Sequence, residues 1–160
     1  MENVEYTEWV PAGALVKGLF VLVSSIILFV TFAVFLFTET LLVTDILGVL
    51  FTWAILAILL FIFWNYRGLR IQIKNNRLSV DYGLFDKKSF LLKEITSCKQ
   101  TKSFGRYLGI GVRYGADGSL AYTTSFATTV EIVPKVGRTF VFSSKHPDQI
   151  CEIITKGMLT

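Results

Sequence analysis

Few of the residue types that carry enzyme chemistry occur in this 160-residue sequence, and they are dispersed along it. His146 is the only histidine, and its position directly before Pro147 is typical of a helix cap or a surface site. No serine lies in a Gly-x-Ser-x-Gly elbow, and Cys98 and Cys151 form no Cys-x-x-Cys pair. The carboxylates available for acid–base catalysis are far apart: Glu94, Glu131 and Glu152. We therefore expect no catalytic residue, no metal site and no cofactor, and a protein that is not an enzyme.

The segment "GIGVRYG", residues 109–115, approaches the glycine pattern of a dinucleotide-binding loop. Its spacing is Gly-x-Gly-x-x-x-Gly, and it leads into a turn rather than a helix, so it does not match that loop. Its glycines are expected to serve a sharp bend or a β-bulge.

Basic side chains are the remaining chemical signal. Residues 1–65 contain one Lys and five Asp or Glu, whereas residues 66–160 contain 15 Lys or Arg and seven Asp or Glu. Six cations fall early in this basic part: Arg67, Arg70, Lys74, Arg77, Lys87 and Lys88. They are candidate contacts for anionic lipid headgroups or for a partner, because each cation near an anionic leaflet contributes on the order of 1 kcal/mol. The alternative is that they only set membrane topology and form solvated faces.

Nucleic acid is not expected as a partner. The basic part has the necessary charge, but its aromatic residues and cations are not interleaved in a recognisable platform.

Two long apolar segments precede the basic part. Residues 18–37 and 46–64 contain no charged residue. At about 1.5 Å per helical residue, each run is roughly 30 Å long, the thickness of the bilayer core. The runs predict a transmembrane hairpin over residues 14–65, with helices at about 14–37 and 42–65. The first run is expected to be retained rather than cleaved as a signal peptide, because glutamates precede it and it is too long.

Polar residues inside the two runs are hydroxyl-bearing: Ser24, Ser25, Thr31 and Thr52. Such side chains usually bond back to their own helix or allow close helix packing. Neither run contains an ionisable residue, so a proton relay or ion pathway is not expected.

The charges that flank the apolar runs predict their direction. The only charged residues of the short connection between them are acidic, Glu39 and Asp45, whereas the segment after the second run is rich in Arg and Lys. By the positive-inside rule, both termini face the cytoplasm and the chain is a multi-pass protein of the inner or plasma membrane. Lys17, Trp64 and Tyr66 are the expected membrane-interface anchors. A Cys98–Cys151 bridge is conceivable, but free thiols are expected in a cytosolic domain.

Residues 66–160 have the pattern of a small β-rich domain, and residues 1–13 are expected to be a cytoplasmic tail. Residues 69–74 and 77–82 alternate apolar and polar residues around Asn75-Asn76, which predicts a hairpin with a type I′ turn. That turn sets Ile73 opposite Leu78 and Arg70 opposite Asp81. Further short strands follow, including a second hairpin around Gly137 in which Pro134 is confined to an edge or a strand end.

The last segment changes to a helical period. Pro147 suits the first helical position, and one apolar face follows at i, i+3, i+4 and i+8: Ile150, Ile153, Ile154 and Met158. About seven strands and one amphipathic helix are therefore expected, with the helix closing the open end of a curled sheet or barrel.

Residues 67–158 resemble the pleckstrin-homology-like (PH-like) domains of small bacterial and archaeal membrane proteins. The resemblance rests on "NNRLSVDYGLFDKKSFLLKEITS", where Gly83-Leu84-Phe85 precedes Leu92, Ile95 and Ser97, and on the ordered motifs of residues 109–154. It implies an α+β protein in which two transmembrane helices precede a strongly bent, seven-stranded antiparallel sheet or barrel capped by a C-terminal helix.

The resemblance also implies a scaffold rather than an enzyme. The expected function is to present a cytoplasmic module to a membrane or cytoplasmic protein partner. A sensor of anionic lipid headgroups and an accessory subunit of a membrane transport or export complex are the alternatives. A specific inositol-phosphate pocket is not expected, because the loop that would form it is reduced to Asn75-Asn76.

Overall fold

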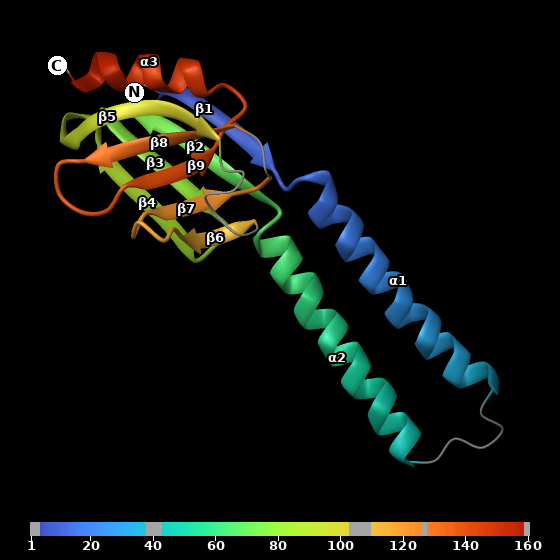
Figure 1. Ribbon diagram of the computed structural model, residues 1–160. Coiled ribbons are helices and arrows are strands. Elements are labelled where there is room, and N and C mark those ends of the chain that lie inside the picture. Colours follow the sequence, from blue (N-terminus) through green and yellow to red (C-terminus); the bar gives the residue numbers. More distant parts are fainter. Residues whose placement is uncertain (1–3, 38–42, 103–109, 126–127, 159–160) are drawn as a thin grey trace. The chain divides into compact units, whose positions relative to one another are not determined.

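The computed structural model describes residues 4–37, 43–102, 110–125 and 128–158 (Figure 1). The chain forms two compact units. A helical unit comprises Gly13–Asn65, and a β-rich unit combines Met1–Ala12 with Tyr66–Thr160. The protein is thus α+β, with two long apolar helices, two sheets and a C-terminal helix.

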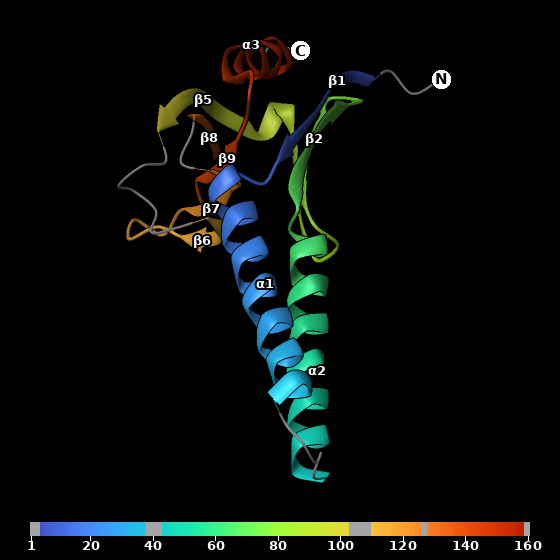
Figure 2. The same ribbon diagram turned by 90° about the vertical axis from the view of Figure 1, so that its right-hand side faces the viewer.

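The helical unit consists of α1 (Ala14–Phe37) and α2 (Val43–Asn65), which lie side by side and antiparallel (Figure 2). Both are apolar on all sides, and their buried residues are Thr31, Leu56 and Asn65. The rings of Phe20 and Phe63 stack at 4.2 Å between the two helices. The hydroxyls of Thr31 and Thr52 donate to carbonyls four residues earlier, as predicted for hydroxyls within such helices.

The β-rich unit begins before the first helix. Strand β1 (Val4–Pro11) pairs antiparallel with β2 (Gly68–Lys74), with Trp9 opposite Arg70 and Val10 opposite Leu69. The prediction that residues 1–13 form a separate tail was therefore wrong. The physical reason is that Glu8 and Val10 alternate with exposed residues and bury their side chains, a period-two pattern that is too short to be decisive in the sequence.

Sheet A contains β1, β2, β3 (Arg77–Tyr82) and β4 (Asp86–Leu91), in that order. The register between β2 and β3 confirms the predicted hairpin, since Ile73 lies opposite Leu78 and Arg70 opposite Asp81. Asn75 and Asn76 both have positive φ, 50 and 58 degrees respectively. A type I′ turn requires positive φ at both of its central residues.

Sheet B is a second, separate sheet. Its strands, in the order β5-β8-β9-β7-β6, are β5 (Ile95–Lys102), β8 (Thr128–Pro134), β9 (Phe140–Ser143), β7 (Leu120–Thr123) and β6 (Gly111–Tyr114). The predicted β8–β9 hairpin is confirmed, and Pro134 lies at the end of its strand.

The expectation of one bent seven-stranded sheet or barrel was wrong. A 3-10 turn, η1 (Leu92–Glu94), separates β4 from β5, and the chain then pairs with β8 instead of continuing sheet A. Both sheets remain open. Among the described strands, β1 and β4 are the edges of sheet A, and β5 and β6 are the edges of sheet B.

The core lies between the inner faces of the sheets and under helix α3 (Pro147–Met158). Ile150 and Ile154 are fully buried, and Ile153 and Met158 pack against the same core, which confirms the predicted apolar face of this helix. Figure 1 shows α3 across one end of the sheets, where it contacts β5, η1 and β8.

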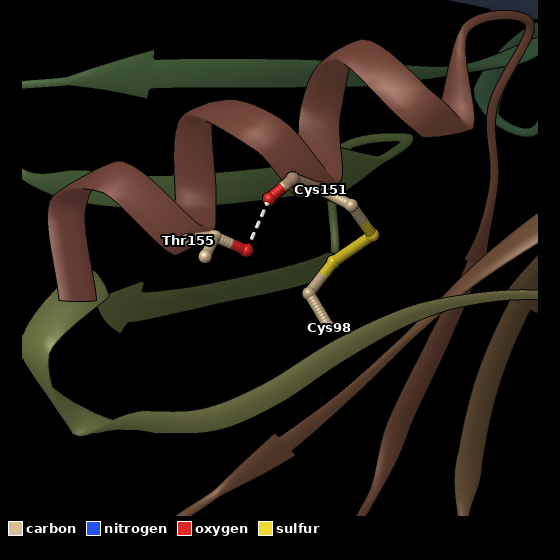
Figure 3. The surroundings of a disulfide bond; sticks show 3 residues. All are labelled: Cys98, Cys151 and Thr155. Atoms are coloured by element: carbon tan, nitrogen blue, oxygen red, sulfur yellow. Dashed lines mark hydrogen bonds between the residues drawn. A yellow bond between two sulfur atoms is a disulfide. The ribbon is translucent and has the colours of Figure 1, made fainter.

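Cys98 and Cys151 form a disulfide that joins β5 to α3, with their Cα atoms 5.4 Å apart (Figure 3). The expectation of free thiols was therefore wrong. It followed from the predicted compartment alone, whereas the fold brings together two cysteines that are 53 residues apart. The hydroxyl of Thr155 donates to the carbonyl of Cys151, one helical turn away.

Candidate functional site

The alternation of side chains in sheet A decides which cations share a face. Ile71 lies opposite Val80, and both are buried, so these positions mark the inner face. Residues on the other face include Arg70 and Asp81, which are paired in register, and Lys87, which lies opposite Asp81 on β4. Four of the six candidate cations gather there, and we call this set the basic face: Arg70, Lys74, Arg77 and Lys87.

The basic face carries an excess of positive charge. Across β2, β3 and β4 its four cations accompany one carboxylate, that of Asp81, which lies between Arg70 and Lys87 in register. Arg70, Arg77 and Lys87 are exposed, and the guanidinium of Arg77 donates to the hydroxyl of Ser89 at 3.1 Å. Such a face attracts anionic groups, and the attraction weakens with added salt.

An aromatic side chain shares this face. Trp9 lies opposite Arg70 and remains 43% exposed. Its ring covers Gly68, where a Cβ atom would collide with the indole. The glycine thus leaves room for the ring close to the strand, next to Arg70.

Two candidate cations lie elsewhere. Lys88 is opposite Val80, which places it on the inner-face side at the edge strand β4. Arg67 precedes β2, and its carbonyl accepts a hydrogen bond from the amide of Ala12 at 2.8 Å. The structure therefore does not bring all six cations into one site.

The expected interface anchors belong to different units. Lys17 and Trp64 are exposed on α1 and α2. Tyr66 belongs to the β-rich unit, where its hydroxyl donates to Asp86 at 2.9 Å and its ring packs edge-on against Tyr82 at 5.3 Å. These contacts give Tyr66 a packing role within that unit.

A buried carboxylate that the sequence analysis did not single out organises the start of α3. The Glu8 side chain accepts hydrogen bonds from the Tyr6 hydroxyl at 3.0 Å, the Ser144 hydroxyl at 2.8 Å and the Lys145 amide at 2.6 Å. Burial, followed by the bond to Glu8, raises the pKa of the Tyr6 phenol.

This cluster contains Ser, His and Glu, but its geometry is that of a cap. Ser144 is buried, and its hydroxyl donates directly to Glu8 while accepting from the backbone amide of His146 at 3.0 Å. The imidazole of His146 therefore does not act as a general base toward the Ser144 hydroxyl. No motif in the sequence points to Glu8, since its partners Ser144 and Lys145 lie 136 and 137 residues further along the chain.

The described residues contain no group of three His, Cys, Asp or Glu side chains placed to hold a metal ion. Comparisons with protein-family models, curated proteins and solved structures give no match to this chain. The interpretation of the basic face therefore rests on its geometry.

Proposed function

We propose that this chain is a non-catalytic membrane protein in which α1 and α2 span the bilayer and the β-rich unit binds a partner protein. The observation that carries the proposal is the pair of apolar helices, 24 and 23 residues long, in which few residues are buried. A soluble protein would bury such helices, whereas lipid solvates them. The resemblance of residues 67–158 to PH-like domains also favours a scaffold.

The β-rich unit and both termini are proposed to lie on the cytoplasmic side of the inner or plasma membrane. Lys and Arg flank the helices on that side and are absent from the connection between them. The Cys98–Cys151 disulfide favours an oxidising compartment instead. We give the flanking charges more weight, because they act on helix insertion itself, whereas redox-active disulfides also form in the cytosol.

The partner is proposed to present an acidic segment to the basic face. Three cations of this face, Arg70, Lys74 and Arg77, stand on β2 and β3, whose register is fixed by a tight turn, so the spacing of their backbone positions is fixed. Rigid, complementary charge favours specific and fast association. Binding that depends on these cations should weaken as salt increases.

The test compares two quadruple variants of the tagged full-length chain in membrane extracts. The first replaces the basic face with alanine, through Arg70→Ala, Lys74→Ala, Arg77→Ala and Lys87→Ala. The control removes four exposed cations elsewhere, through Lys93→Ala, Arg113→Ala, Lys135→Ala and Lys145→Ala. Quantitative mass spectrometry should find a protein that is retained by the control, released by salt and lost from the first variant. Equal retention by both variants would refute the proposal.

Anionic lipid is a second candidate partner, favoured by the exposed indole of Trp9 among the cations. Tryptophan beside lysine and arginine is the usual composition of a membrane-surface contact. A nitroxide on Ser79→Cys, within this face, would report it in nanodiscs. The measured quantity is the ratio of the label's collision rate with oxygen to its collision rate with a water-soluble nickel complex. If lipid is the partner, this ratio should be higher in nanodiscs that contain anionic lipid than in nanodiscs without it. An unchanged ratio would exclude the lipid.

A further inference from the structure

A cavity of approximately 350 Å³ opens between the two sheets, away from the basic face. Phe90 on β4 and Phe140 on β9 contribute rings whose centroids are 5.3 Å apart, so both sheets line it. Leu120, Pro134 and Val136 add further apolar surface. At roughly 30 Å³ per non-hydrogen atom, the share of a water molecule in the liquid, this space holds about ten such atoms.

The charged residues that line the cavity are both cations, Lys88 and Arg138. Lys88 comes from sheet A, whereas Arg138 comes from the β8–β9 turn, where it lies 5.8 Å from the ring centroid of Tyr114. Within the described part of the chain, neither cation lies within ion-pair distance of a carboxylate. The cavity thus combines an apolar, aromatic floor with uncompensated positive charge.

Lys88 also has a simpler role as a charged residue on an edge strand. A charged residue that points inward from an edge strand prevents the edge from pairing with another sheet. One lysine is sufficient for that purpose. It does not account for Arg138, which reaches the same cavity from the other sheet, or for the aromatic floor between them.

We propose that this cavity binds an organic anion, with a carboxylate held by Lys88 and Arg138 and an apolar group packed on Phe90 and Phe140. Guanidinium and ammonium groups bind carboxylates through charge-assisted hydrogen bonds, and the rings remove the apolar group from water. Two kinds of ligand combine a carboxylate with an apolar group in this way: a small aromatic or branched acid, and the C-terminal residue of an extended peptide. The outer edge of β4, which pairs with no other described strand, would pair with the backbone of such a peptide.

The test uses the full-length chain in nanodiscs of zwitterionic lipid, with 3-(4-fluorophenyl)propanoate as the probe and fluorine NMR line broadening as the signal. The acid should bind in the millimolar range or tighter, and the neutral 3-(4-fluorophenyl)propanamide should bind at least about tenfold more weakly. Acetyl-Ala-Ala-Phe, as free acid and as amide, forms the peptide arm. Binding of the peptide acid that is about tenfold tighter than that of the probe identifies a peptide terminus, and weaker or equal binding identifies a small acid.

Matched variants separate this site from general charge effects. Lys88→Gln and Arg138→Gln should each weaken binding of the acid about five- to tenfold. Lys87→Gln, the neighbour on the other face of β4, and Lys135→Gln, in the same turn as Arg138, should leave it unchanged. The unfolding temperature of each variant verifies that the fold persists.

Three results would overturn the proposal: no broadening with either acid, equal binding of acid and amide, or equal losses in the control variants. The outcome is independent of the proposed function, because neither Lys88 nor Arg138 belongs to the basic face. The quadruple alanine variant of that face retains the cavity cations and should bind the probe as the wild type does.

Discussion

Glu8 accepts a hydrogen bond from the hydroxyl of Ser144 across 2.8 Å, although 136 residues separate the two in the sequence. Glu8 lies on β1, before the first apolar helix, and Ser144 lies between β9 and α3. The bond therefore connects β1 to the segment between β9 and α3 within the β-rich unit, and both side chains are buried.

Replacement of Glu8 should destabilise the β-rich unit. Glu8→Ala leaves the buried hydroxyl of Ser144 and the amide of Lys145 without their acceptor, which costs about 2–3 kcal/mol. Glu8→Gln should cost less, because its amide oxygen still accepts one of these bonds. Thermal unfolding of the full-length chain measures both, with Glu152→Gln as the control, since Glu152 forms an exposed ion pair. Equal unfolding temperatures for Glu8→Ala and wild type would contradict a stabilising role of the Glu8 hydrogen bonds.

The disulfide should contribute to stability by limiting the unfolded chain. Its two cysteines have a sequence separation of 53. Closing a loop of that order typically contributes about 2–4 kcal/mol. Cys98→Ser with Cys151→Ser, or reduction of the wild type, should lower the unfolding temperature and release α3 from β5. Amide hydrogen exchange in Pro147–Met158 should then accelerate more than in sheet A. Identical exchange in the oxidised and reduced protein would refute this role.

Stability should fall at alkaline pH because of buried tyrosines. Burial raises the pKa of Tyr82 from 10.0 to about 12. Between these values the unfolded state has lost the proton and the folded state retains it, so stability decreases by up to about 1.4 kcal/mol per pH unit, and it is unaffected below pH 10. Tyr82→Phe should flatten this loss, although it also removes the hydrogen bond to the carbonyl of Thr123.

Denaturant unfolding across this pH range measures the slope. A slope in Tyr82→Phe as steep as in wild type would show that other groups cause the loss.

Local rules predicted the parts of the fold that local chemistry determines. The apolar runs specified both long helices, and Asn75-Asn76 specified the turn and register of the β2–β3 hairpin. The apolar face of α3 followed from its helical period in the same way. In each case the decisive interactions are local in the sequence or run along one helix.

Features that depend on distant pairing did not follow from the sequence. β1 pairs with a strand that lies beyond both helices, and β5 leaves sheet A to pair with β8. Nothing in the sequence around Glu8 identifies its partners Ser144 and Lys145. The Cys98–Cys151 pair was conceivable, but the sequence does not show that the fold brings the two cysteines together. The candidate site was predicted in part, because the hairpin register placed Arg70, Lys74 and Arg77 on one face while the face of Lys88 depended on the β3–β4 register.

The central prediction is that α1 and α2 cross the membrane and that the β-rich unit lies in the cytoplasm. Ser79→Cys marks the β-rich unit, and Thr44→Cys marks the start of α2, next to the connection between the helices. A membrane-impermeant maleimide should label Thr44→Cys in intact cells and should label Ser79→Cys only after permeabilisation. Labelling of both positions without permeabilisation, or of Ser79→Cys alone, would contradict this topology.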